Sequence, residues 1–312
     1  MINRRHIRVK VMQSVYAMTH AQSDNLVKEE KFLRSSIDKM YDLYVLSLDM
    51  IVRVNQLAEN TLEASKKKFL ATKEELNPNR KFINNKAVQL LKESTSLQNY
   101  LEETKLNNWY LDSSYVNNMY KKLLESDLYK NYMAEEETSF KKDKQFLIHF
   151  FEEFIAPDEK IAEYYEGENI SWVDDIPFVN TWIVKTLQEL KAEKPFVLGK
   201  MYKNADDEAF VSDLFKKVVL NLSKLEEEVA DKTPNWELDR IADVDMILIK
   251  MAICEFLKFP SIPVKATINE YLEIAKDYST EKSSVFINGV LDKTWKDFDK
   301  NGRLKKIGRG ML

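Results

Sequence analysis

The chain of 312 residues carries a formal net charge of −4 and contains only six glycines, seven prolines and one cysteine. This length is enough to bury one or two substantial cores. The lone Cys254 excludes a disulfide within the chain and fits a reducing compartment. No run approaches the roughly 20 uncharged apolar residues of a membrane span, so we expect a cytoplasmic protein without a membrane segment.

Strong helix formers with apolar residues at three-to-four spacing dominate the chain, and strand signals are scarce, which predicts an all-α fold. The first helix is expected over residues 3–20. Its apolar stripe consists of Ile7, Val11, Val15 and Met18. A second, unusually long helix is expected from about residue 28 to 64, and the more polar residues 65–140 predict short amphipathic helices.

Two later segments, residues 143–190 and 207–254, resemble each other when one is shifted by 64 positions. The matched pairs include Asp143 and Asp207, Phe146 and Phe210, and Trp172 and Trp236. The match predicts an internal duplication of one helical unit. Chance register between two helical patterns is the alternative.

The C-terminal part begins with a largely apolar helix over residues 244–259, which should be central to its core. After two prolines, Thr267 and Glu270 have the spacing of a capping box and predict a helix start. Ser279 and Thr280 predict the N-cap of a last helix, which carries Phe286.

No catalytic or metal-binding motif is present. The three histidines are scattered, and the chain has neither an HExxH nor a CxxC motif. It also has no glycine-rich phosphate loop after a strand. The sequence therefore predicts a protein that is not an enzyme and needs no cofactor or metal.

Basic residues gather at both ends of the chain. No acidic residue precedes Asp24, and seven lysines and arginines from Lys293 to Arg309 face only two aspartates. Basic side chains beside exposed aromatic ones are typical of single-stranded RNA binding. The candidates are Arg4, Arg5, Arg8 and Tyr16 in the first helix and Lys282, Phe286 and Asn288 in the last. A solvated helix edge for the arginines, and core packing of Phe286 against Val290, are the alternatives.

Three stretches resemble the NusB family of bacterial transcription antitermination proteins. They are residues 4–16, led by arginines and ending in Tyr16; residues 210–225 with 236–242; and residues 262–270 with 286–293, from Ile262-Pro263-Val264-Lys265-Ala266 to Phe286-Ile287-Asn288-Gly289-Val290-Leu291-Asp292-Lys293. The last is the most specific. The chain is longer than a usual member, like the enlarged forms of the Bacteroidetes, and about 150 residues lie between the matching parts.

The resemblance implies a helical bundle of two subdomains, formed by residues 1–64 and 205–312 and enlarged by a helical insertion over 65–204. Members bind single-stranded boxA RNA, often ribosomal, together with NusE, a small-subunit ribosomal protein. They then join the RNA polymerase antitermination complex. By this resemblance Arg4, Arg5 and Arg8 contact RNA, and Phe286 stacks on a base. Val244, Asp245 and Leu248 would face NusE.

One departure from the family concerns Val285, because many members carry a basic residue at that position. Its absence removes a possible phosphate contact. Two other functions remain open on the sequence: a helical protein-interaction scaffold that has lost RNA binding, and an accessory domain like the one that precedes certain RNA cytosine methyltransferases. No cofactor-binding α/β segment follows to support the second.

Overall fold

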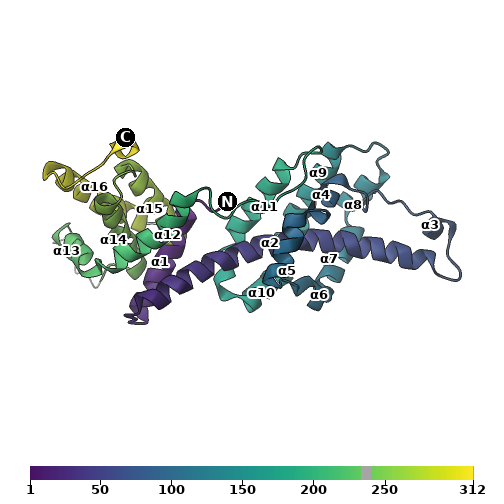
Figure 1. The fold of residues 1–312 in the computed structure, drawn as a ribbon, viewed down its shortest axis with the longest axis horizontal. Helices are drawn as coiled ribbons and strands as arrows, with labels where there is room; N and C mark the ends of the chain where they lie inside the picture. Colours follow the sequence, from purple (N-terminus) through teal and green to yellow (C-terminus); the bar gives the residue numbers. More distant parts are fainter. Residues whose placement is uncertain (233–239, 312) are drawn as a thin grey trace. The chain divides into compact units, whose positions relative to one another are not determined.

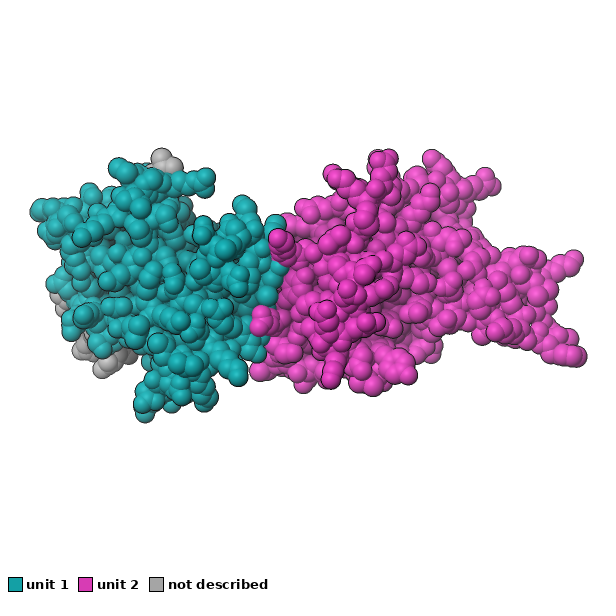
Figure 2. Space-filling view, in the orientation of Figure 1, with its two compact units in different colours: residues 1–37, 201–312 teal, residues 38–200 magenta. Residues whose placement is uncertain are grey.

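The computed structural model describes residues 1–232 and 240–311, apart from the side chain of Glu74. These residues contain helices and no strand, so the all-α prediction is confirmed. Trp236, used in the proposed duplication and in the family resemblance, lies outside them. The chain divides into two compact units, one formed by residues 1–37 and 201–312 and the other by residues 38–200 (Figure 2). We call these unit 1 and unit 2.

Unit 1 is built around one apolar helix, α14 (Asp243–Lys258), as the sequence predicts. Around it lie α1 (Arg4–His20), α12 (Ala205–Val219), α13 (Leu222–Lys232), α15 (Val264–Tyr278) and α16 (Ser283–Lys300), as Figure 1 shows. The start of α2 (Leu26–Lys66) pairs with α12 through Glu30 and Lys216. Leu248, Ile249 and Ile253 of α14 are completely buried. A helix packed on all sides needs this nearly continuous apolar surface.

The C-terminal tail returns to the end of α14. The Lys306 ammonium donates to the carbonyl oxygens of Glu255 and Phe259, at 3.2 and 3.0 Å. Partial burial lowers the pKa of Lys306 to about 8. Further along, in η4 (Gly308–Met311), a Cβ on Gly310 would lie 1.9 Å from the carbonyl oxygen of Pro260. Only glycine allows this close backbone approach.

Unit 2 contains the rest of α2 and a set of shorter helices. They are α3 (Lys73–Leu76), α4 (Lys86–Lys92), α5 (Thr95–Thr104), α6 (Asn108–Leu111), α7 (Ser113–Glu125), α8 (Asp127–Ala134), α9 (Phe140–Phe150) with a π turn (Phe151–Ile155), α10 (Glu159–Glu168), the 3-10 turn η2 (Ile170–Trp172) and α11 (Ile176–Glu189). Aromatic side chains fix them to α2. Tyr44 stacks on Trp182 at 4.2 Å, and the Trp109 indole donates to the carbonyl oxygen of Leu46 at 2.7 Å.

The suggested duplication has a counterpart in the order of the helices. Shifted by 64 residues, α9 with its π turn and then α10 coincide with α12 and α13 to within one residue at each end. Asp143 and Asp207 are both buried near the start of their helices. The Asp143 carboxylate accepts a hydrogen bond from the Tyr132 hydroxyl on α8, and the Asp207 carboxylate accepts one from Arg4 on α1. The duplication itself stays a prediction.

Both helix starts predicted near the C-terminus are wrong. α15 begins at Val264 after Pro263, so Thr267 lies one turn inside the helix, where its hydroxyl donates to Glu255 at 3.3 Å. Pro263 takes the N-cap position with an extended backbone and has no N–H group of its own to satisfy, so the helix starts ahead of the threonine. α16 begins at Ser283 without a side-chain cap, and the Ser279 hydroxyl donates to Asp245 at 2.6 Å instead.

Candidate nucleic-acid interface

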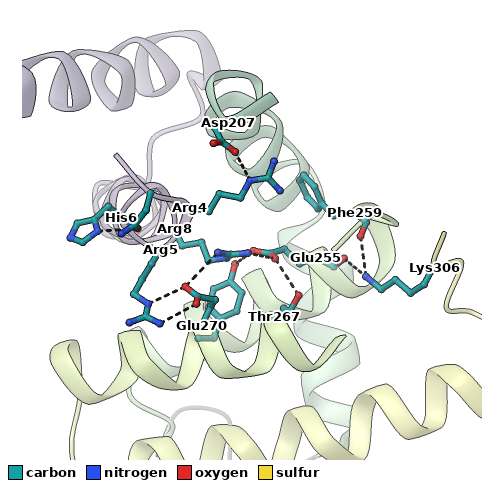
Figure 3. Close-up of polar contacts among 12 residues, drawn as sticks. Arg4, Arg5, His6, Arg8, Asp207, Glu255, Phe259, Thr267, Glu270 and Lys306 are labelled. Carbon is teal, nitrogen blue, oxygen red and sulfur yellow. Dashed lines mark hydrogen bonds and ion pairs between the residues drawn. The ribbon is translucent and has the colours of Figure 1, made fainter. Parts of the chain in front are cut away.

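A buried carboxylate at the centre of unit 1 anchors the arginine-bearing helix α1. The Arg8 guanidinium donates to both oxygens of Glu255, at 2.7 and 2.9 Å, and the hydroxyl groups of Tyr271 and Thr267 donate to the same carboxylate (Figure 3). Arg8 is 3% exposed and Glu255 is completely buried. The pKa of Tyr271 is raised well above its usual value by burial and by the Glu255 charge. In this structure Arg8 holds α1 to α14, and contact with RNA would require that pair to open.

Arg4 and Arg5 lie nearer the surface. Arg4 donates through Nε to Asp207 at 2.6 Å, and its guanidinium lies 4.9 Å from the centre of the Phe210 ring. Arg5 forms two hydrogen bonds of 3.0 Å with Glu270 on α15, which raise its pKa. Their side chains are 37% and 38% exposed. A guanidinium has five N–H groups, so both retain donors for a phosphate.

His6 lies between Arg5 and Arg8 in the sequence, and its environment favours the neutral imidazole. Burial, followed by the positive charges of Arg5 and Lys10, lowers its pKa from 6.5 to about 4. The folded chain therefore binds this proton less readily than the unfolded chain does. The resulting stability is fully present above pH 6.5 and is lost as the pH falls towards 4.

We expect a His6→Gln variant to lose less stability in acid than the wild-type chain does. Between pH 7 and 4 the difference should reach about 1–2 kcal/mol, below the full value of the shift because the ring is partly hydrated. Urea unfolding at several pH values measures it. If the free energy of unfolding falls equally with pH in the two proteins, the lowered pKa of His6 is contradicted.

The other predicted RNA-binding residues lie at the start of α16: Lys282 directly precedes the helix, Phe286 is in its first turn and Asn288 is in its second. Phe286 is half-buried, whereas Lys282 and Asn288 are exposed. The helix start has no side-chain cap and no acidic residue in its first turn, an arrangement that favours anions. Val285 is 74% exposed, so the position at which the family resemblance leads us to expect a basic residue faces solvent.

The remaining predicted residues gather near the start of α14. Tyr16 is 39% exposed, and its ring lies 4.1 Å from His20, which pairs with Asp243 at 3.2 Å. Val244 is half-buried and Asp245 is buried. Leu248 is completely buried in the core. It therefore offers no surface to a partner in this structure and could only support the residues around it.

Hydrogen bonds bring the start of α14 to the start of α16. The Ser279 hydroxyl donates to Asp245 and lies 2.9 Å from the hydroxyl of Ser283, the first residue of α16. The predicted NusE-facing residues therefore neighbour the helix that carries Phe286. Arg4, Arg5 and Arg8 reach α12, α15 and α14, and none of these hydrogen-bond partners lies on α16. However, α1 and α16 both belong to unit 1, where α14 packs against each of them.

Comparison with known proteins assigns the chain to a family. The NusB family model matches residues 181–296. A protein named transcription antitermination protein NusB from Natranaerobius thermophilus is 33% identical over 114 residues, which are 36% of this chain and 82% of that protein. The chain belongs to the NusB family.

Two relatives with the same name are more similar over a smaller part of their length. The Chloroherpeton thalassium protein is 42% identical over 103 residues, which are 33% of this chain and 49% of that relative. The Salinibacter ruber protein is 41% identical over 103 residues, or 33% of this chain and 64% of that relative. The chain therefore matches about half to two thirds of the length of these relatives. No solved structure matched the chain.

The NusB match begins within α11 and ends within α16; it includes Phe286 but does not extend to α1. The arginines join the NusB segment through Asp207, Glu255 and Glu270, partners that the sequence reasoning missed. The sequence did point to Glu255, because a carboxylate inside a largely apolar helix is buried only when it is paired. Its partner lies 247 residues away, a separation that helical periodicity does not predict.

The part of the chain that the structure describes holds neither a metal-ligand cluster nor a membrane-spanning helix. No group of three or more histidine, cysteine, aspartate or glutamate side chains there could hold a metal ion. None of the helices in that part is long and apolar enough to cross a membrane.

Proposed function

We propose that this protein is a transcription antitermination factor that binds single-stranded boxA-type RNA together with NusE. It then joins the RNA polymerase antitermination complex, with ribosomal RNA operons as the expected targets. The observation that carries the proposal is the NusB segment itself, which includes the uncapped, acid-free start of α16 beside Phe286. The three relatives that match about a third of the chain are named transcription antitermination proteins. We assign no catalytic step to the protein.

The chemistry of unit 1 suits single-stranded RNA. Phe286 and Tyr16 offer aromatic rings on which bases can stack, and Lys282 and Asn288 offer exposed polar groups close to Phe286. Base stacking on an aromatic side chain tolerates many sequences, and basic groups nearby hold the phosphates. Arg4 and Arg5 supply further charge once RNA competes with their carboxylate partners. Arg8 positions this surface indirectly, because its ion pair with Glu255 fixes α1 against α14.

NusE would bind beside this surface. Val244 and Asp245 lie at the start of α14. Ser279 links Asp245 to the start of α16 through hydrogen bonds to Asp245 and Ser283. A partner that covers this region would exclude water from the neighbouring RNA contacts, which strengthens them. Joint binding of RNA and NusE should therefore be tighter than binding of either one alone.

Titration of a boxA-type RNA with this protein, with and without NusE, tests the proposal. We expect weak binding by the protein alone and tighter binding with NusE. For three phosphate contacts the logarithm of affinity should fall against the logarithm of salt with a slope of about −2. No RNA binding under any of these conditions would overturn the proposal and favour a protein-interaction scaffold.

A further inference from the structure

Unit 2 has an exposed basic and aromatic tip that the NusB segment does not include. It consists of Lys66, Lys67, Lys68, Phe69 and Leu70, and we call it the lysine tip. It lies where α2 ends and the chain turns towards α3 (Figure 1). In Figure 2 this end of unit 2 narrows to a protrusion.

The two apolar side chains of the lysine tip have no cover. Phe69 is 100% exposed and Leu70 is 84% exposed, and no other aromatic side chain among the described residues is as exposed as Phe69. Leaving a whole ring in water brings the folded chain no gain from burial. The position of Phe69 is therefore better explained by contact with a ligand than by packing.

The surroundings of Phe69 are positively charged. From residue 64 to 73 the chain carries four lysines and no acidic residue. Lys66 pairs with Glu63 at 2.9 Å, and Lys68 pairs with Glu75 at 2.6 Å. Lys67 is exposed and has no ion-pair partner among the residues that the structure describes. Lys66, Lys67 and Lys68 outnumber the two carboxylates that pair with them, and Lys67 is the charge left available to a polyanion.

We propose that the lysine tip is a second contact for single-stranded RNA, with one base stacked on Phe69 and a phosphate held by Lys67. This inference rests on the proposed RNA-binding function and extends it to unit 2. Stacking on an exposed ring beside lysines is the common way of holding single strands without sequence preference. The tip would therefore hold RNA outside the boxA-type element.

Two other occupants fit the tip less well. A membrane surface is held by an amphipathic helix with a broad apolar face, whereas the tip offers two neighbouring apolar side chains beyond the end of α2. A protein interface is depleted in lysine at its centre and usually needs a larger apolar patch. A single ring among lysines is sufficient for one stacked base.

The test compares two RNAs, a short one with only the boxA-type element and a long one in which an unstructured single strand extends it. We expect wild-type protein with NusE to bind the long RNA more tightly. Phe69→Ala should weaken long-RNA binding about fivefold to hundredfold, the range for one stacked base, and leave short-RNA binding unchanged. Lys67→Gln should reduce the salt slope for the long RNA by about 0.7.

Three further variants separate stacking from other causes. Phe69→Trp should retain long-RNA binding, while Phe69→Leu, which keeps an apolar side chain without a ring, should behave like Phe69→Ala. Tyr110→Ala is the matched control, because Tyr110 is 75% exposed in unit 2 and has no lysine within four residues of it in the sequence. It should bind both RNAs like the wild type. All of these side chains lie in solvent, so thermal unfolding should be unchanged.

The outcomes distinguish this inference from the proposed function. If Phe69→Ala binds the long RNA as tightly as the wild type does, the proposed RNA contact at the lysine tip is wrong, whereas the proposed binding of boxA-type RNA is unaffected. If the wild type binds neither RNA, the proposed function has failed, and with it the inference. The wild type and Phe69→Leu can also be sedimented with phosphatidylserine-containing vesicles. If both proteins bind the vesicles, the ligand of the lysine tip is a membrane surface and the proposed RNA contact is wrong.

Discussion

Replacing Glu255 with alanine is expected to lower the free energy of unfolding of unit 1 by about 3–5 kcal/mol, the usual effect of breaking a buried ion pair. The change leaves the Arg8 guanidinium, 3% exposed, without its carboxylate. It also removes the acceptor for the hydroxyl groups of Thr267 and Tyr271. Urea unfolding of the full chain measures the effect, and hydrogen exchange of the α14 amides locates it.

The matched control is a surface pair in the same unit. Asp213 and Lys217 on α12 lie 3.5 Å apart with both side chains exposed. Asp213→Ala should change the free energy of unfolding by no more than about 0.5 kcal/mol. Replacing Arg8 and Glu255 together with methionine and leucine should recover much of the loss, because no charge is then buried alone. A loss below about 1 kcal/mol in Glu255→Ala would contradict the structural importance of this pair.

This pair also decides how an Arg8 variant should be interpreted. Arg8→Ala would be expected to weaken RNA binding even if Arg8 never contacts RNA, because α1 would lose its anchor to α14. Arg5 differs, since its side chain is 38% exposed and its partner Glu270 lies near the surface. Only loss of RNA binding without loss of stability indicates direct contact, so Arg5 is the more informative position.

Helical periodicity closely predicted the bounds of the first two helices. An apolar stripe placed the first helix at residues 3–20, where α1 spans Arg4–His20, and the second at about 28–64, where α2 spans Leu26–Lys66. Such patterns are reliable because each helix must bury one face. The continuous apolar run of α14 likewise predicted its central place in unit 1.

Contacts between distant helices could not be predicted in the same way. Thr267 and Glu270 fit a capping box, but the same spacing also places two side chains on one face inside a helix. Only the fold shows that Thr267 faces Glu255 and that Glu270 faces Arg5. Nor did periodicity indicate that the division between the two units falls within α2, after residue 37.

Replacing Phe286 with alanine is expected to weaken binding of boxA-type RNA by about 1–3 kcal/mol, the value of one stacked base. Phe286 is half-buried, so part of its ring packs against unit 1 and truncation also affects stability. Phe286→Leu keeps most of the packed volume without a ring. It should unfold near the wild-type temperature and still bind RNA weakly. Fluorescence anisotropy of labelled RNA measures the affinity.

Phe32→Ala is the matched control, since Phe32 is 57% exposed in unit 1 and lies outside the candidate interface. It should bind RNA like the wild type. If Phe286→Leu also binds like the wild type, Phe286 is a packing residue and the stacking role is excluded.

A gain of affinity would be stronger support than a loss, because damage to the fold does not produce it. Val285→Lys places a basic residue directly before Phe286, at a position that is 74% exposed. If RNA passes over Phe286, this lysine should tighten binding and steepen the salt slope by about 0.7. Lysine at Val27, 76% exposed on α2, adds the same charge to unit 1 away from this helix. Equal gains at both positions would indicate general attraction by charge, whereas a gain at Val285 alone would locate the RNA beside Phe286.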